Sequence, residues 1–180
     1  VNTNADGTAV KTPGTDIFPY LKENLDDIIT VGDEELVVSF LDMVENHKMV
    51  VENSGLLTVA ALKHLDVKNK KVVAILSGGN MDVITMSSVV QQGLVLRDRI
   101  FSVSVLLPDK PGELSRVADV IAKQNGNVIK LEHNQFVSIN RNAEVELRIT
   151  MEAFGTEHKN QIISSLQQNG YQPKLIRASI

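Results

Sequence analysis

The sequence predicts two parts of different fold class, an α/β segment followed by a small α+β module with the element order βαββαβ. In the first part, apolar residues at helical spacing alternate with short apolar runs, a pattern typical of α/β layers. From Ile100 onward, apolar and polar residues alternate along strand-length segments separated by two helical patterns. Between the two, residues 92–99 combine a glycine that should break the preceding helix with a cluster of charges. We therefore expect one domain over residues 1–96 and a second over residues 97–180.

The first part should begin with a helix capped by Asp16, with Pro19 in its first turn. Asp33 is the expected N-cap of the next helix, whose apolar residues recur at helical spacing. The other expected elements are a short buried strand at 27–31, an extended segment at 49–51, helices at 56–65 and 81–91, and a strand at 71–76.

The strand expected at 71–76 is a continuous apolar run after a pair of lysines, which is typical of a parallel strand buried on both faces. The chain lacks the strands with which it should pair, so we expect exposed apolar faces here. The chain also begins at Val1 without an initiator Met. We interpret it as a fragment whose first part is the less stable half.

The second part contains six expected elements. They are a strand at 100–107, a helix after the turn Asp109-Lys110-Pro111-Gly112, strands at 127–135 and 143–152 joined by a polar loop at 138–142, a second helix, and a strand at 171–176. Gly126 and Gly170 lie just past the ends of the two helices, and Thr156 is the expected cap of the second. This order predicts a sheet with two helices on one face and a polar opposite face.

The composition excludes several classes of protein. Of the 180 residues, 43% are hydrophobic and 22% are charged, with a formal net charge of -4, so no basic surface indicates nucleic acid or an anionic membrane as a partner. There is no cysteine, which excludes disulfides and thiolate metal sites. No apolar run approaches the roughly 20 residues needed to span a bilayer, and no signal-peptide pattern is present. We expect a cytoplasmic protein.

Three functional classes share the βαββαβ order, and the third strand distinguishes them. An RNA-recognition module needs aromatic residues there, whereas the outward positions are Glu144, Glu146, Arg148, Thr150 and Glu152. A metal-trafficking module needs paired cysteines, and the four histidines (His47, His64, His133, His158) show no ligand spacing. A sensor of small molecules is the class that remains.

The turn Asp109-Lys110-Pro111-Gly112, followed by Leu114 and later by Asn125-Gly126-Asn127-Val128, resembles that of ACT domains, ferredoxin-like modules that bind amino acids. Gly112 lets the backbone approach a ligand, and the N–H groups of a helix start favour a carboxylate. The resemblance implies an effector held by Asp109, Pro111, Gly112 and Leu114, facing Asn127 and Val128 of a partner module, hence a homo-oligomer. Alternatively, Pro-Gly is only a turn and the module only dimerises.

In the first part, the run at 71–76 ends in Ser77-Gly78-Gly79-Asn80 and leads into a helix. A strand, a glycine turn and a helix form a cofactor-binding geometry in α/β proteins, although a dinucleotide fingerprint and a P-loop are absent. Together with Ala5-Asp6-Gly7-Thr8-Ala9-Val10-Lys11 and His47-Lys48-Met49-Val50-Val51-Glu52, this turn resembles the threonine dehydratase (threonine ammonia-lyase) family, pyridoxal-phosphate enzymes of fold type II. The resemblance covers essentially the whole chain.

That resemblance implies a role for each matching residue. Ser77 would hydrogen-bond the pyridine nitrogen of the cofactor, Glu52 would lie close to the ring, Gly78 and Gly79 would leave it room, and Asn80 would start the following helix. A neutral hydroxyl does not hold the nitrogen protonated, which suits elimination over transamination. Glu52 could instead be only a charge at the start of the helix before Leu56.

The sequence departs from the family in lacking both the Ser-Phe-Lys-type motif with the Schiff-base lysine and the glycine-rich loop for the phosphate. Lys70 and Lys71 read as a solvated charge run, so we expect no catalytic residue and no activity in this segment alone. The full-length enzyme would convert threonine to 2-oxobutanoate and ammonia, and the module would bind isoleucine or a similar amino acid. The alternatives are a non-catalytic amino-acid-binding or dimerisation module, and the tail of a catabolic serine/threonine dehydratase.

Overall fold

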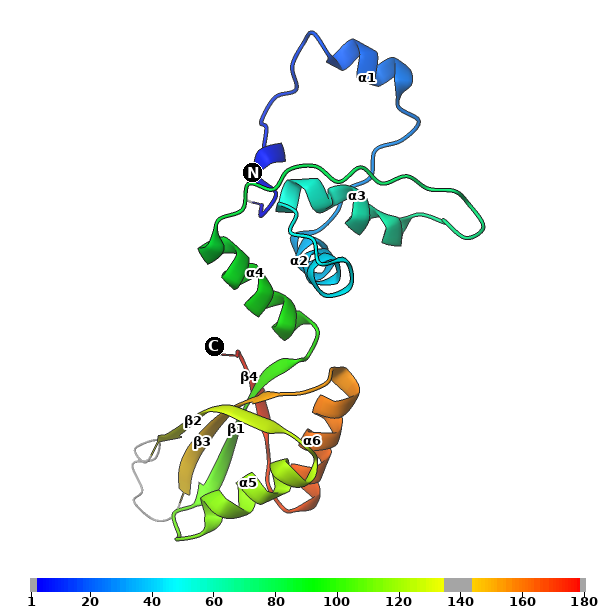
Figure 1. Cartoon of the computed structure of the whole chain (residues 1–180). Helices are drawn as coiled ribbons and strands as arrows, with labels where there is room; N and C mark the ends of the chain where they lie inside the picture. Colours follow the sequence, from blue (N-terminus) through cyan, green and yellow to red (C-terminus); the bar gives the residue numbers. More distant parts are fainter. Residues whose placement is uncertain (1–2, 135–143, 179–180) are drawn as a thin grey trace. The chain divides into compact units, whose positions relative to one another are not determined.

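The computed structural model describes residues 3–134 and 144–178, and the chain divides into two units, Val1–Gly93 and Leu94–Ile180 (Figure 1). The polar loop predicted at 138–142 lies outside the described residues. In the described ranges, no helix is long and apolar enough to cross a membrane.

The second unit has the predicted order of elements. They are β1 (Ile100–Pro108), α5 (Glu113–Lys123), β2 (Asn127–Asn134), β3 (Glu144–Glu152), α6 (Thr156–Gln168) and β4 (Lys174–Ile176). The strands form one antiparallel sheet in the order β2-β3-β1-β4, and α5 and α6 cover one face of it (Figure 1). The βαββαβ prediction is confirmed.

The core of this unit follows from the alternation of its strands. In the register of β1 with β3, Val103 lies opposite Ile149 and Val105 opposite Leu147, so the apolar side chains of both strands share one face. These side chains are fully buried against Val117 and Ile121 of α5 and against Ile162 and Leu166 of α6. At roughly 25 cal/mol per Å² of apolar surface, this burial is the main source of stability for the unit.

Two helix ends in the second unit differ from prediction. The N-cap of α6 is Gly155, at φ 123°, and Thr156 is its first residue, whose hydroxyl donates to Asp98 instead of capping the helix. After α5, Asn125 and not Gly126 adopts the left-handed conformation, at φ 59°. Gly126 is needed for space, because a Cβ there would lie 2.7 Å from Ile121 Cγ2 and 3.0 Å from Ile162 Cδ1.

The first unit is built from helices and short helical turns. They are η1 (Asp6–Thr8), α1 (Phe18–Asn24), α2 (Asp33–Asp42), η2 (Met43–His47), η3 (Asn53–Leu56), α3 (Leu57–Ala60), η4 (Ala61–His64) and α4 (Val83–Leu96). The helix predicted at 56–65 is therefore a series of three short turns over 53–64. The core of the unit joins α2 to these turns and to α4 through buried residues that include Leu36, Phe40, Leu56, Ala60 and Val89.

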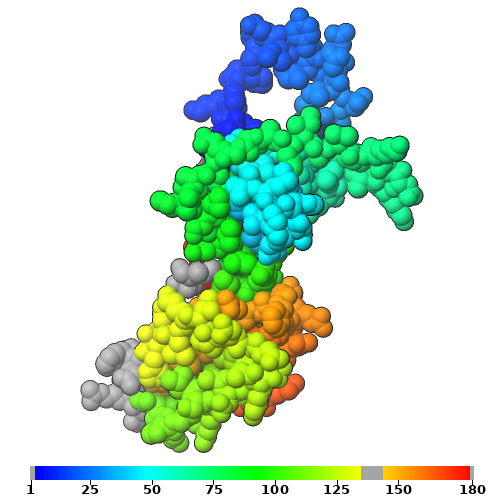
Figure 2. All heavy atoms as spheres, in the orientation of Figure 1, coloured from blue at the N-terminus to red at the C-terminus, as the bar shows by residue number. Residues whose placement is uncertain are grey.

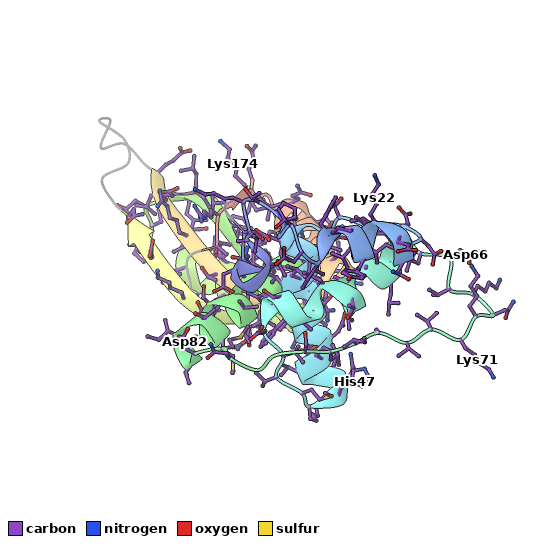
Figure 3. The ribbon with its side chains drawn as sticks, turned by 90° about the horizontal axis from the view of Figure 1, so that it is seen from above. Lys22, His47, Asp66, Lys71, Asp82 and Lys174 are labelled. Atoms are coloured by element: carbon purple, nitrogen blue, oxygen red, sulfur yellow. The ribbon has the colours of Figure 1, made fainter. Side chains whose placement is uncertain are left out.

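The strands predicted at 27–31 and 71–76 are wrong, and the segment at 49–51 forms no strand. A strand needs a neighbour for its N–H and C=O groups, and none is present among the described residues of this unit. Val73 is 90% exposed and Ile28 is 77% exposed, in agreement with the expected uncovered apolar faces. In Figure 3, Asp66 and Lys71 lie on a loop that stands away from the helices, and Figure 2 shows residues 10–30 as an arch.

Two further expectations for the first unit are corrected. The N-cap position of α1 is occupied by Ile17 and not by Asp16, while Pro19 lies in the first turn as predicted. Gly93 does not break α4, which continues to Leu96. A Cβ at Gly93 would lie 2.6 Å from Leu41 Cδ1, so this glycine serves the close packing of α4 on α2.

The N-cap position of α2 is occupied by Gly32, not by Asp33. The N–H of Gly32 donates to Oε2 of Glu35 at 2.9 Å, which is the side-chain half of a capping box. This backbone hydrogen bond lowers the pKa of Glu35, with a further contribution from His64, whose Nε2 lies 2.8 Å from Oε1. Asp33 is thus free to bond elsewhere in the unit.

Candidate functional site

Three segments that are far apart in the sequence meet at Glu52. The backbone N–H of Glu52 donates to the carbonyl of Gly78 at 3.3 Å, and its Oε2 accepts the N–H of Asn80 at 3.1 Å. Gly78 adopts φ 77°, and a Cβ there would overlap the Glu52 carboxyl group. A residue without a side chain is therefore required for the carboxylate to lie against this turn.

The η1 turn lies close to Ser54 and to the Glu52 carboxylate. A Cβ at Gly7 would lie 2.9 Å from Ser54 Oγ and 3.9 Å from Glu52 Oε1. Glycine here lets the η1 backbone pack directly on the start of η3. The structure thus brings together residues of all three motifs on which the family resemblance was based.

Ser77 and Gly79 lie at the open edge of the same turn. The carbonyl of Ser77 packs so closely on Gly55 that a Cβ at Gly55 would overlap it. Thr58 Oγ1 donates to the Ile75 carbonyl at 2.8 Å and fixes the approach to the turn. Ser77 is exposed, and within the described part of the chain its hydroxyl has no partner; Gly79 has open space around it. Among the described residues no hydrogen bond joins Ser77 to Glu52, although both were predicted for one site.

A hollow of about 500 Å³ adjoins this cluster, lined by polar residues that include Asp6, Glu52, Asn53, Asn80 and Asp82. Asn53 is 6% exposed, and its Nδ2 donates to the Asn4 carbonyl at 3.0 Å. Its Oδ1 and the Ser54 hydroxyl are buried with no partner among the described residues. Buried polar atoms of this kind are costly unless water or another polar group pairs with them.

Asp82 has a structural role in this hollow that sequence reasoning missed. Its Oδ1 accepts the N–H groups of Ile84 and Thr85 at 2.9 and 3.0 Å, which makes it the N-cap of α4. The Thr85 hydroxyl and these backbone bonds lower the pKa of Asp82. The signal was an aspartate three residues before a threonine at the start of an apolar helical pattern.

The second candidate site lies at the turn between β1 and α5. A hollow of about 340 Å³ is lined mainly by apolar groups, among them Leu107, Pro111, Leu114 and Val145, with His133 at its side. Gly112, at φ 92°, is the N-cap of α5, and its carbonyl accepts the N–H of Arg116 at 3.1 Å. The predicted residues Asp109, Pro111, Gly112 and Leu114 all line this hollow.

Asn127 and Val128 lie elsewhere in the same unit. Asn127 is opposite Glu152 in the register of β2 with β3 and donates to its Oε2 at 2.7 Å, whereas His133, at the hollow, is opposite Leu147. Asn127 and Val128 therefore lie at the opposite end of β2 from His133 and the hollow. One copy of the chain does not bring the six predicted effector residues together.

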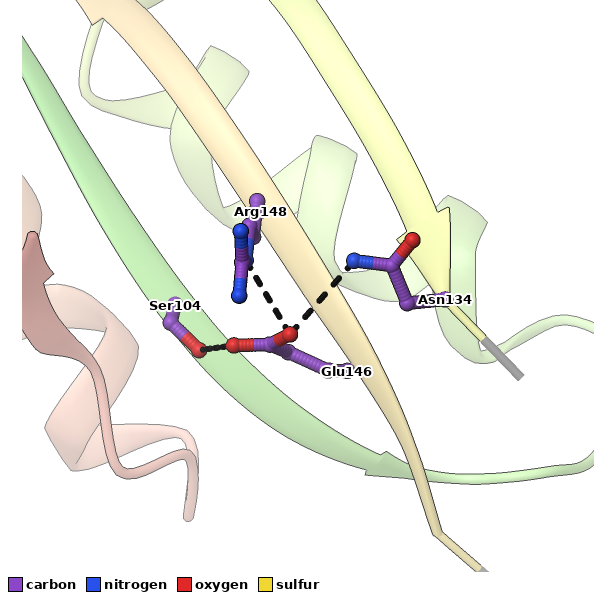
Figure 4. A network of polar contacts seen from close by, with 4 residues as sticks. All are labelled: Ser104, Asn134, Glu146 and Arg148. Carbon is purple, nitrogen blue, oxygen red and sulfur yellow. Dashed lines mark hydrogen bonds and ion pairs between the residues drawn. The ribbon is translucent and has the colours of Figure 1, made fainter. Parts of the chain in front are cut away.

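The open face of the sheet carries a polar network centred on Glu146 (Figure 4). Its carboxylate accepts Ser104 Oγ at 2.6 Å, Arg148 Nε at 3.0 Å and Asn134 Nδ2 at 3.4 Å. The bonds from Ser104 and Arg148 lower the pKa of Glu146. The network stabilises the ionised Glu146 carboxylate between three strands.

No group of three or more potential metal ligands occurs in the described ranges.

Comparison with known proteins shows similarity over both units. Residues 1–78 match the family model described as pyridoxal-phosphate dependent enzyme. The chain is 38% identical over 171 residues to an L-threonine ammonia-lyase of Geobacter sulfurreducens, covering 94% of this chain and 42% of that protein. It is 33% identical over 175 residues to an L-threonine ammonia-lyase of Thermotoga maritima, covering 97% and 44%. A biosynthetic L-threonine dehydratase of Pasteurella multocida is 30% identical over 173 residues, with 93% and 32% covered.

The chain therefore spans less than half the length of these relatives. A crystal structure of a Bacteroides thetaiotaomicron protein is 22% identical, with a TM-score of 0.33 over 43% of this chain and 48% of that one, a likeness too weak to extend the inference. The family match and the threonine ammonia-lyase relatives indicate pyridoxal phosphate as the cofactor of the full-length enzyme.

Proposed function

From the match of its first unit to pyridoxal-phosphate dependent enzymes, we propose that this chain is the C-terminal, regulatory portion of a threonine ammonia-lyase. The full-length enzyme converts L-threonine to 2-oxobutanoate and ammonia. One observation carries the proposal: the similarity to the Geobacter sulfurreducens enzyme covers 94% of this chain and so includes both units.

The residues around Glu52 fit one edge of the cofactor. Ser77 presents an exposed hydroxyl without a partner among the described residues, and nothing described lies within 4 Å of a Cβ at Gly79. The Asn53 Oδ1 and the Ser54 hydroxyl are buried without a hydrogen-bond partner among the described residues, which supports a polar group supplied from outside this chain. Among the described residues that line the adjoining hollow there is no lysine, and we assign the lysine and the phosphate site to the rest of the enzyme.

Pyridoxal phosphate, when bound, draws electrons from the substrate and so allows its β-hydroxyl to leave. Ser77 contributes a neutral hydroxyl to the pyridine nitrogen, which does not keep that nitrogen protonated and so favours elimination over transamination. Glu52 presents a carboxylate whose direction is set by the N–H of Asn80 and the bare backbone of Gly78. The 180-residue chain has no lysine in a suitable context and is inactive alone.

The second unit acts as the amino-acid sensor of the ACT type. The start of α5 offers N–H groups to a carboxylate, and the apolar hollow receives a branched side chain such as that of isoleucine. Asn127 and Val128 of a second copy complete the site, which requires a homo-oligomer. Effector binding then shifts a two-state equilibrium of the catalytic domains by a coupling of about 1–3 kcal/mol.

The test is an assay of the full-length enzyme with L-threonine and L-serine, with and without isoleucine. We expect 2-oxobutanoate from threonine and a lower rate when isoleucine is added. Absence of a product from threonine in cofactor-loaded enzyme would overturn the assigned reaction. Turnover without any response to isoleucine or valine would leave the reaction and remove the sensor.

A further inference from the structure

Asp33, at the start of α2, holds the segment that flanks Glu52. Its Oδ1 accepts the Thr3 hydroxyl at 2.6 Å and its Oδ2 accepts the Asn4 N–H at 3.1 Å. The Thr3 hydroxyl oxygen in turn accepts the Ala5 N–H at 3.2 Å. Both carboxylate oxygens of Asp33 are thus engaged by a segment about thirty positions away in sequence, and not by its own helix.

The same segment reaches the Glu52 cluster from its other side. The carbonyl of Asn4 accepts Asn53 Nδ2 at 3.0 Å, and Asn53 directly follows Glu52 in the chain. Ala5 is buried in the core of the unit, and two residues later Gly7 packs on Ser54, close to Glu52 Oε1. One series of contacts therefore joins the Asp33 carboxylate to Asn53 and Ser54, the two residues that follow Glu52 in the chain.

We propose that Asp33 is a positioning residue for Glu52, acting through the tether Thr3–Asn4–Asn53. The inference rests on the proposed function, in which the Glu52 carboxylate lies beside the cofactor ring. The Glu52 carboxylate accepts the Asn80 N–H and lies against Gly78, and a Cβ at Gly7 would lie 3.9 Å from its Oε1. Without Asp33 the Gly7 side is released, and the carboxylate gains conformational freedom.

An ordinary role for Asp33 would be a favourable charge at the N-terminus of α2. Glu34 is the matched control, because it lies in the same first helical turn and is exposed, and no hydrogen bond among the described residues joins it to Thr3 or Asn4. Asp33→Asn and Glu34→Gln remove the same charge from the same helix end. Only Asp33→Asn replaces one of the two acceptor oxygens of the tether by a donor.

The experiment compares these two variants, with Asp33→Glu and Thr3→Val, in the full-length enzyme. The first readout is hydrogen exchange over residues 3–9. We expect faster exchange in Asp33→Asn and in Thr3→Val, and wild-type exchange in Glu34→Gln. The second readout is turnover of threonine, where misplacement of Glu52 should lower kcat by about tenfold to a hundredfold, with KM nearly unchanged and partial rescue by Asp33→Glu.

Equal exchange in Asp33→Asn and Glu34→Gln would overturn the tether, and equal kcat in the two would overturn the positioning role. If Asp33→Asn fails to fold, Thr3→Val decides, because it removes the same hydroxyl contact from the other end of the hydrogen bond, at a partly exposed residue. Inactive wild-type enzyme would instead contradict the proposed function. The exchange comparison would still decide whether Asp33 holds the flank of Glu52.

Discussion

The Glu52 carboxylate occupies the space that a side chain at position 78 would need. Glycine is required at position 78 for two reasons. It has no Cβ to overlap the carboxylate, and it adopts φ 77°, where other residues are strained. Glu52 also bonds this turn through its backbone N–H and through its Oε2. The turn and the acid therefore form one structural element, and a change in either should disturb both.

Gly78→Ala should lower the free energy of unfolding of the chain by roughly 1–3 kcal/mol, since the left-handed conformation alone costs about 1–2 kcal/mol. Gly79→Ala is the control, because nothing lies within 4 Å of a Cβ there and its φ is not in the left-handed region. Chemical denaturation of both variants is the measurement. Equal losses of stability would show that the Glu52 contact has no special weight.

Asp98 ties the start of the second unit to α6. Its Oδ1 lies 2.7 Å from Lys159 Nζ and its Oδ2 accepts the Thr156 hydroxyl at 2.8 Å. Burial raises the pKa of Asp98, but the hydrogen bonds from Lys159 and Thr156 outweigh it and lower the pKa overall. Because the folded-state pKa is depressed, the stabilisation is present above the unfolded pKa of about 3.9 and is lost as the pH falls through the folded value.

Wild-type stability should therefore decline with acidification below about pH 5 more steeply than that of Asp98→Asn. Asparagine keeps the preference for the left-handed backbone at this position, where φ is 54°. Asp119→Asn, on the exposed surface of α5, serves as the control. Parallel curves of unfolding free energy against pH for wild type and Asp98→Asn would contradict the assignment.

His158 joins the end of β3 to the end of α5. Its Nδ1 accepts the Phe154 N–H at 3.0 Å, and its Nε2 lies 2.6 Å from the Gln124 carbonyl, so the ring accepts through Nδ1 and donates through Nε2. The substitution His158→Ala should lower the free energy of unfolding by about 1–2 kcal/mol. The matched change His133→Ala, on an exposed ring, should have a smaller effect. Nitrogen chemical shifts that place the proton on Nδ1 would contradict the geometry.

The second unit was predicted well because the alternation of apolar and polar residues along its strands indicates which face of each strand is buried. The first unit was predicted less well, since a strand at 71–76 depends on neighbours that the chain does not supply. The predicted N-caps of α2 and α6 were wrong for one reason. Gly32 and Gly155 occupy the N-cap positions, while the side chains of Asp33 and Thr156 bond residues that are distant in sequence. Spacing cannot reveal such partners.

In both candidate sites, too, the sequence indicated some residues and missed those whose roles depend on distant contacts. Resemblance to a family indicated Glu52, Gly78 and Asn80, which the structure brings into contact. The roles of Asn53 and Asp33 had no sequence signal, because each depends on a contact with the Thr3–Asn4 segment. In the second unit, local sequence indicated the turn at Gly112, but Asn127 lies at the far end of β2.

Leu114 tests the proposed effector site. It is 43% exposed and lines the apolar hollow at the turn, whereas Leu106 is 48% exposed and does not line it. Calorimetric titration of the chain with isoleucine should show binding. Leu114→Ala should lower the affinity for isoleucine about tenfold, equivalent to about 1.4 kcal/mol. Leu106→Ala should bind as the wild type does. A loss of affinity in both variants would argue against this hollow as the site.

Val73 tests whether the first unit is completed by the rest of the enzyme. The apolar run around Val73 is typical of a strand buried on both faces. The Val73 side chain is nevertheless 90% exposed, and its segment has no partner strand among the described residues. In the 180-residue chain, Val73→Thr should change the free energy of unfolding by less than about 0.5 kcal/mol, as at other exposed positions. In the full-length enzyme the same change buries a hydroxyl and should cost about 1–3 kcal/mol. Val103→Thr, in the closed core of the second unit, should be destabilising in both proteins. Denaturation of the four variants would decide, and a neutral Val73→Thr in the full-length enzyme would mean that this strand remains uncovered there.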